Sequence, residues 1–157
     1  MSAACASTGA VSRPFPTPGG TSPPATSSRG DSHRSADRYG VVGTALALRG
    51  ARYKNGGADP NGFDCSGFTW YVFGQHGVVL PRDVHDQSRM GKAITRNRLA
   101  AGDLIFFSTV APGASHVGIA IGGDAFVHAP SSTGVVRVER LSARYWRPRF
   151  VGARRLN

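Results

Sequence analysis

One cysteine and two histidines in this chain have the types and spacing needed for nucleophilic catalysis. Cys65 directly follows Asp64, a residue type that caps helix N-termini, so we expect Cys65 in the first turn of a helix. Exposed backbone amides at a helix N-terminus favour an anion and thereby lower the pKa of a thiol placed there. Since the thiolate is the reactive form, the sequence predicts Cys65 as a nucleophile.

The two histidines supply a candidate base and a candidate orienting group. His116 begins an alternating apolar segment and His128 ends the next, with a hairpin signal at 122–124 between them. Antiparallel strands joined this way would bring both side chains to one edge of a sheet. We predict that His116 is the base towards Cys65 and that His128 holds its imidazole through the other ring nitrogen.

Structural roles for these residues remain open at this point. A cysteine on an amphipathic helix is also typical of a small core residue, and a histidine at a strand end is also typical of the surface. Cysteine and two histidines could bind zinc, but no short paired spacing such as C-x-x-C is present, so no metal site is expected. His33, His76 and His85 have no predicted partner.

The apolar pattern changes from helical to alternating spacing along the chain. We expect helices over 41–48, from Asp64 to near Gly77, and over 83–90. Strands are expected over 103–107, 116–121, 125–128, 135–138 and 149–153, with a helical turn near 143–145. Helices followed by an antiparallel sheet indicate an α+β fold.

The domain boundary is predicted near Ala36. Residues 1–35 are rich in Ser, Thr, Pro and Gly and cannot bury enough apolar surface to order themselves, so we expect a disordered tether. Residues 36–157 form the predicted folded domain. Small residues before Cys5 resemble the end of a bacterial lipoprotein signal, although Ser2 stands where Leu is usual, so lipidation of Cys5 is expected. Alternatively, Cys5 is an ordinary residue of the tail.

The charge balance predicts an anionic partner. Nineteen Lys and Arg against nine Asp and Glu give a formal net charge of +10, which would attract an anionic membrane or wall surface. The alternative is that the excess arginines only solvate the surface. No nucleic-acid-binding motif is visible, so nucleic acid is not expected. No apolar run is long enough to span a membrane, and we expect a monomer without a cofactor.

Several motifs occur in the order found in a known family. They are Arg52-Tyr53, Gly56-Gly57, Asp64-Cys65-Ser66-Gly67, Leu80-Pro81-Arg82, Gly102-Asp103-Leu104-Ile105-Phe106-Phe107, His116-Val117-Gly118-Ile119 and Phe126-Val127-His128-Ala129. In this combination residues 36–157 resemble the NlpC-type cell-wall cysteine peptidases. The resemblance is strongest to Spr-type murein endopeptidases, which are lipoproteins of Gram-negative outer membranes. It implies a compact papain-like fold.

The resemblance also implies roles for the site residues. Cys65 matches the nucleophile, His116 the base and His128 the polar third residue. Tyr53 matches a tyrosine whose hydroxyl binds substrate or the developing oxyanion. Asp64 and Ser66 match positions that flank the nucleophile and contact the substrate's free amine in relatives. Arg82 matches a residue that lines the cleft. Alternatively, Asp64 is only a helix cap and Arg82 only a surface charge.

The expected function is hydrolysis of an amide bond in peptidoglycan stem peptides through a thioester. Spr-type relatives suggest the D-alanyl–diaminopimelate cross-link, and the wider family suggests the D-glutamate–diaminopimelate bond. Lys54-Asn55 and Asp83 differ from the residues that relatives often have at these positions, and the difference bears on which stem peptide is preferred. The tether and Cys5 imply export to the periplasm and anchoring to the outer membrane. The alternatives are a non-catalytic wall-binding module and an acyltransferase on the same fold.

Overall fold

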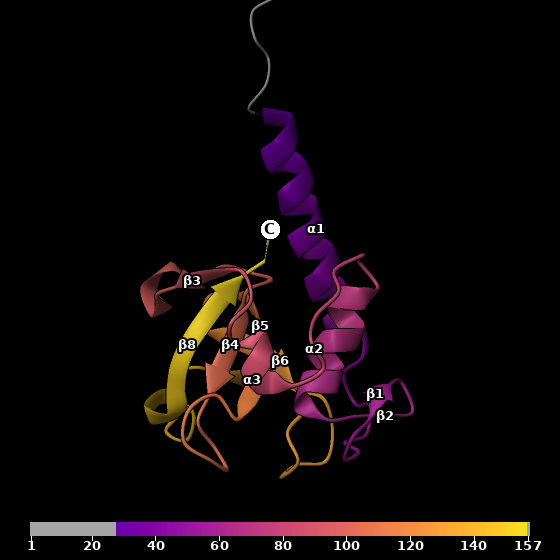
Figure 1. Cartoon of the computed structure of the whole chain (residues 1–157), viewed down its shortest axis with the longest axis vertical. Helices are drawn as coiled ribbons and strands as arrows, with labels where there is room; N and C mark the ends of the chain where they lie inside the picture. The colour runs from indigo at the N-terminus through magenta and orange to yellow at the C-terminus, as the bar shows by residue number, and fades with distance from the viewer. Residues whose placement is uncertain (1–27, 157) are drawn as a thin grey trace, which may run out of the picture.

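Two helices pack beside a six-stranded antiparallel sheet, so the predicted α+β architecture is confirmed (Figure 1). A computed structural model describes residues 28–156, with side chains from Asp37 onward. Helix α1 (Ser28–Ala47) contacts helix α2 (Cys65–Gly74), and both contact the sheet through strand β5 (His116–Gly122). The N-terminus of α2 therefore lies where β5 begins.

The sheet has six strands in the order β3-β8-β4-β5-β6-β7, and every neighbouring pair is antiparallel. Its remaining strands are β3 (Lys92–Ile94), β4 (Leu104–Phe107), β6 (Ala125–His128), β7 (Arg137–Arg140) and β8 (Phe150–Arg155). The hairpin β5–β6 pairs Gly118 with His128, which brings His116 and His128 to the same edge of the sheet as the spacing predicted.

Helix α2 forms because its first turn is capped and its apolar side chains face the sheet. The Asp64 carboxylate accepts a hydrogen bond from the Gly67 amide at 2.6 Å, as expected of an N-cap. Phe68 and Val72 are fully buried at helical spacing. A short hairpin of β1 (Ala58–Asp59) and β2 (Gly62–Phe63) leads directly into this turn. The cap and the hairpin together fix the direction of Cys65.

Apolar residues cover both faces of the sheet. The face towards α1 and α2 carries one cluster, which includes Phe106, Val117 and Ile119. The opposite face carries a second cluster centred on Phe107 and Trp146, which the segment 141–150 covers. Because adjacent residues of β4 and β5 point to opposite faces, these strands are buried on both sides.

Several predicted element bounds are wrong. The strand expected over 135–138 begins at Arg137, because Val135 and Val136 instead pair with residues 50–53. The helical turn expected near 143–145 is the 3-10 helix η2 (Arg147–Arg149), and the helix expected over 83–90 is the shorter α3 (Val84–Gln87). Strand β3 and the 3-10 helix η1 (Arg96–Arg98) were not predicted.

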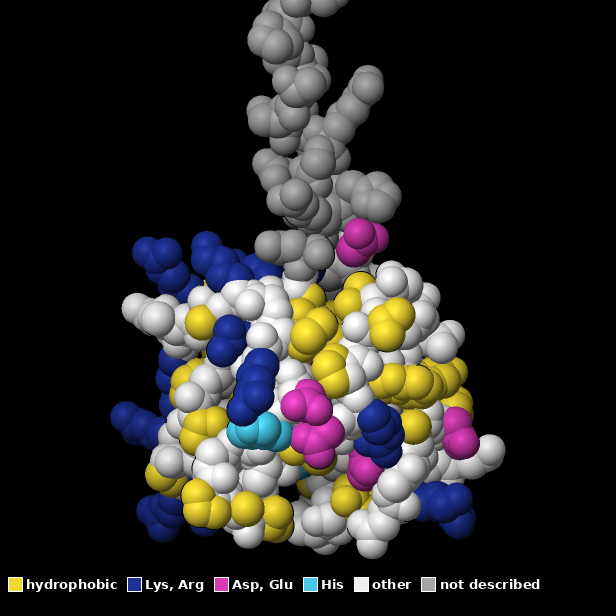
Figure 2. Space-filling model, viewed as in Figure 1, with side chains coloured by type: hydrophobic (Ala, Val, Ile, Leu, Met, Phe, Trp, Pro, Cys, Tyr) yellow, Lys and Arg dark blue, Asp and Glu magenta, His cyan; other side chains and the backbone are white. Residues whose placement is uncertain are grey.

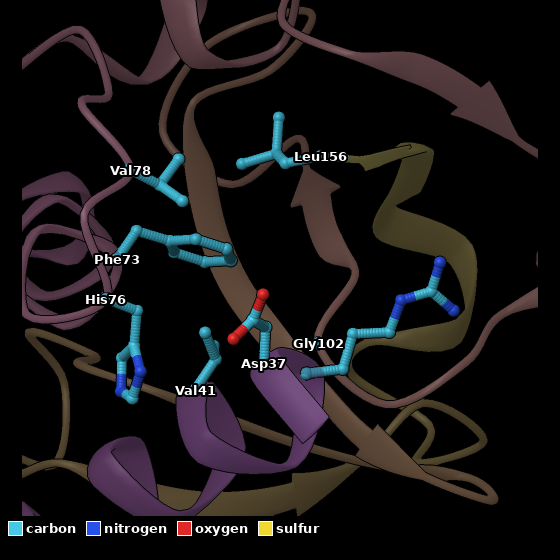
Figure 3. A pocket seen from close by; sticks show the side chains of 8 residues that line it. Asp37, Val41, Phe73, His76, Val78, Gly102 and Leu156 are labelled. Atoms are coloured by element: carbon cyan, nitrogen blue, oxygen red, sulfur yellow. The ribbon is translucent and has the colours of Figure 1, made fainter. Parts of the chain in front are cut away.

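Helix α1 begins at Ser28, inside the segment predicted as a tether. The predictions for residues 1–27, including Cys5, lie outside the described residues. Within residues 28–156, no helix combines the length and apolar character needed to cross a membrane. A pocket between α1, the end of α2 and the C-terminal segment is lined by Val41, Phe73 and Leu156 and by none of the predicted site residues (Figure 3).

The close approach of α2 to residue 57 can be tested at Gly67. A Cβ there would lie 1.9 Å from the Gly57 carbonyl oxygen, so Gly67→Ala should lower the free energy of unfolding by about 1–3 kcal/mol. Urea denaturation measures it. Gly74→Ala, in the same helix with open space around the new Cβ, is the matched control and should be neutral or stabilising by about 0.5–1 kcal/mol. Equal stabilities for the two variants would contradict the packing.

Candidate active site

Cys65 is the first residue of α2 and carries a free, half-buried thiol. Backbone N–H groups of Val117, Ser66 and Cys65 itself hydrogen-bond the sulfur and act to lower its pKa. Burial and the Asp64 carboxylate act more strongly in the other direction, so the pKa of the Cys65 thiol is raised. The amides at the helix N-terminus thus act in the expected direction but are outweighed, so the thiolate needs a partner that accepts the proton.

His116 opens strand β5 and is buried with 7% of its surface exposed. Burial, followed by the neighbouring charge of His128, lowers the pKa of His116 to about 3, and Glu139 opposes this shift. His116 is therefore neutral at physiological pH and free to accept a proton. Its neighbour Val117 donates its amide to the sulfur of Cys65, which places the His116–Val117 backbone against the nucleophile.

His128 lies at the end of β6 and is completely buried. Its Nδ1 lies 2.7 Å from Nε2 of His116, so the two rings share one hydrogen bond. Burial lowers the pKa of His128, while the adjacent carboxylate of Glu139 raises it. The structure thus brings His116 and His128 together in the arrangement that the sequence predicted, with His128 on the side of His116 reached through Nε2.

Two residues that the sequence analysis missed complete this arrangement. The Glu139 carboxylate on β7 lies 2.5 Å from Nε2 of His128. The buried indole of Trp146 stacks on His116 with ring centroids 5.4 Å apart and meets His128 edge-on at 4.9 Å. Trp146 also hydrogen-bonds Glu139. The available signal was that Glu139 is the chain's only glutamate and stands within an alternating segment.

Asp64, Ser66 and Arg82 form one polar cluster beside Cys65. The Arg82 guanidinium donates to Asp64 and to the Ser66 hydroxyl, both at 2.8 Å, and to the Gly57 carbonyl at 3.2 Å. The Arg82 side chain is 40% exposed and that of Asp64 20%, so both face solvent in part. Asp64 is therefore both the helix cap and part of this cluster, as the two interpretations of it allowed.

A fully buried glutamine supports this cluster from behind. Gln87 on α3 donates to the carbonyls of Ser66 and Pro81 at 3.1 and 2.8 Å, and its side-chain oxygen accepts from the Thr69 hydroxyl. This residue ties the first turn of α2 to the segment that carries Arg82. It was not singled out in the sequence, because a glutamine in a short polar helix carries no special pattern.

Tyr53 packs half-buried against the helix-side core and lies near the nucleophile. Burial raises the pKa of its phenol, and the negative charges of Cys65 and Asp64 add to the effect. The hydroxyl therefore stays protonated and able to donate. Backbone bonds to Gly134 and the bridge to Phe63 hold this segment in place. The structure thus places Tyr53 within reach of the charges of both Cys65 and Asp64.

Two of the other histidines bond to groups outside this site. His76 shares a hydrogen bond with the Thr44 hydroxyl on α1, and His85 with the Arg89 guanidinium. His33 is outside the described side chains. No group of three or more His, Cys, Asp or Glu side chains that could hold a metal ion occurs among the described residues.

Comparison with known proteins identifies the family. The NlpC/P60 family model matches residues 50–155. The chain belongs to the NlpC/P60 family. It is 43% identical over 109 residues to the murein DD-endopeptidase MepS/murein LD-carboxypeptidase of Escherichia coli K12, covering 69% of this chain and 57% of that protein.

Another relative and a solved structure are also similar to this chain. A gamma-D-glutamyl-L-lysine dipeptidyl-peptidase of Bacillus cereus is 36% identical over 117 residues, covering 73% of this chain and 35% of the relative. A crystal structure of an NlpC/P60 family protein from Bacillus cereus superimposes with a TM-score of 0.71 at 35% identity, over 75% of this chain and 39% of that one. The chain thus spans little more than half, or less, of these proteins, while its fold is that of their shared domain.

Proposed function

We propose that this protein is a cysteine-type peptidase that hydrolyses an amide bond in peptidoglycan stem peptides. The observation that carries the proposal is the hydrogen-bonded pair His116 and His128, placed beside the free thiol of Cys65 at a helix N-terminus. The names of the relatives, a murein endopeptidase and a dipeptidyl-peptidase, support a peptidase acting on this kind of substrate.

The reaction proceeds in two halves. The Cys65 thiol gives its proton to His116 while its sulfur attacks the carbonyl carbon of the scissile amide. Backbone N–H groups beside Cys65 and the Tyr53 hydroxyl donate hydrogen bonds to the developing oxyanion. His116 then passes the proton to the departing amine, and a thioester remains on Cys65. Water, deprotonated by His116, attacks the thioester, releases the new carboxyl group and restores the thiol. No metal or organic cofactor takes part.

The partly exposed cluster of Asp64 and Arg82 supports recognition of a charged end of the stem peptide. A carboxylate at 20% exposure offers an acceptor for an ammonium group, and the guanidinium offers donors for a carboxylate. Diaminopimelate carries both groups. We propose the D-alanyl–diaminopimelate cross-link as the first candidate bond, because the E. coli relative is named a DD-endopeptidase, and the D-glutamate–diaminopimelate bond as the second.

Export and an anionic surface belong to the same proposal. We propose that the protein works in the periplasm, anchored to the outer membrane through a lipidated Cys5. Lys and Arg side chains gather on the side of the molecule where β3 and β8 lie (Figure 2). Lys92 on β3 is an exposed example. This side would meet anionic lipid or wall polymer by charge attraction.

The catalytic proposal predicts the behaviour of the two cysteine variants. Cys65→Ala should keep its unfolding transition and lose turnover of purified muropeptides by about 10⁴-fold or more, because the nucleophile is gone. Cys5→Ala is the matched control and should digest soluble muropeptides at the wild-type rate. Mass spectrometry reads the products. Cross-linked dimers converted to monomers identify the first bond, and shortened monomer stems the second.

Retained activity in Cys65→Ala would contradict the mechanism. A transferred acyl group in place of new amines would favour an acyltransferase. Binding without cleavage by the wild-type protein would favour a wall-binding module.

The anchoring proposal predicts a diacylglyceryl mass on the N-terminal cysteine of native protein extracted from membranes. Mass spectrometry of that protein checks it. An unmodified Cys5 in membrane-extracted protein would contradict lipid anchoring. Release of non-lipidated protein from anionic vesicles by raised salt is expected in addition, since screening weakens charge attraction.

A further inference from the structure

The row of side chains behind Cys65 does not end at His128. The Glu139 carboxylate, on the neighbouring strand β7, lies 2.5 Å from Nε2 of His128, and His128 Nδ1 lies 2.7 Å from Nε2 of His116. His116 and His128 are buried, whereas the Glu139 side chain is 24% exposed. A continuous hydrogen-bonded row therefore runs from the nucleophile's base to a carboxylate at the surface.

We propose that Glu139 is a positioning residue that fixes the tautomers of both histidines and so leaves Nδ1 of His116 unprotonated to take the proton of Cys65. This inference rests on the proposed function and adds a fourth member to its catalytic row. It does not make Glu139 a catalytic residue, because Glu139 contacts His128 and neither the sulfur nor the scissile bond.

The tautomers follow from the acceptor-only chemistry of a carboxylate. Hydrogen bonds from His128 and Trp146 hold the pKa of Glu139 below its usual range, so it is ionised at neutral pH. An ionised carboxylate can only accept, so the single ring proton of neutral His128 must sit on Nε2. Its Nδ1 then has a lone pair and can only accept from His116.

The same constraint passes on to His116. Because His128 Nδ1 accepts, Nε2 of His116 must be the protonated nitrogen, and the lone pair of His116 lies on Nδ1. Without the carboxylate, His128 could carry its proton on Nδ1 and donate to His116. The proton of His116 would then occupy Nδ1, which could no longer accept from the thiol.

Glu139 also offsets the charge formed during the reaction. When the S–H bond of Cys65 breaks and an N–H bond forms on His116, a cation appears in a buried site where burial opposes it. The Glu139 charge acts in favour of that cation, while the neighbouring His128 acts against it. On β7, Arg137 favours the neutral form of His128, and Asp64 near Cys65 opposes the thiolate.

Trp146 holds both ends of this row in place. Its ring stacks on His116 with an interplanar angle of 24°, and its side chain hydrogen-bonds Glu139. Only 5% of its surface is exposed, so the indole excludes water from the histidine pair. Trp146→Phe keeps an aromatic ring and removes the donor to Glu139. This substitution therefore loosens the carboxylate without deleting it.

Glu139→Gln tests the proposal with two readouts. With muropeptides, kcat should fall about 10-fold or more with little change in KM, because substrate contacts are untouched. The rate of iodoacetamide alkylation of Cys65 at neutral pH should fall several-fold, because the lone pair of His116 is no longer held on Nδ1 and the imidazolium that forms as the S–H bond breaks loses its carboxylate. Asp124→Asn, which removes the same charge from the β5–β6 turn, is the control and should leave both readouts at the wild-type value.

An unchanged kcat together with an unchanged alkylation rate in Glu139→Gln would overturn the proposal. If that variant fails to fold, Trp146→Phe replaces it and should lower the alkylation rate by a smaller factor, whereas an unchanged rate overturns the proposal. The alkylation readout needs no substrate. If the wild-type protein cleaves no muropeptide but Glu139→Gln shows the predicted fall in alkylation rate, the proposed function fails and the role of Glu139 stands.

Discussion

The contact between the first turn of α2 and the first residues of β5 is the constraint on which the site depends. Asp64 caps that turn, and the absence of a side chain at Gly67 allows it to press against the Gly57 carbonyl. Arg82 clamps the same turn from outside. These contacts hold the sulfur of Cys65 against the Val117 amide, next to the residue that we propose as its base. A shift of this turn would separate thiol and imidazole.

Electrostatics determine the protonation states of Cys65 and His116 before substrate binds. Burial raises the pKa of Cys65 and lowers the pKa of His116 to about 3, so the resting pair is a neutral thiol beside a neutral imidazole. Neither group has to be charged until substrate arrives. Negative charge then forms on the sulfur, which backbone amides face, and positive charge forms on the histidines, which Glu139 stabilises. The amides and Glu139 are in place before the reaction starts.

Residues whose role depends on local structure could be predicted from the sequence. Asp64 and Cys65 could be placed because an N-cap is local, and His116 and His128 because a tight hairpin fixes their relation. Glu139 could not be placed, because its meeting with His128 depends on the register of β6 with β7. The segment 50–53 pairs with Val135 and Val136 through backbone hydrogen bonds, so β7 begins only at Arg137. The sequence pattern does not contain that long-range pairing. Trp146 was missed for a similar reason, since its position depends on how segment 141–150 folds over the sheet.

Trapping the covalent intermediate tests the central claim most directly. Wild-type protein mixed briefly with a muropeptide substrate and quenched in acid should carry the acyl half of the stem peptide, and digestion should locate the added mass on Cys65 through a thioester that hydroxylamine removes. The added mass also identifies the bond that was cut. An acyl group on any other residue would contradict the account. So would turnover of substrate by protein whose Cys65 has been alkylated.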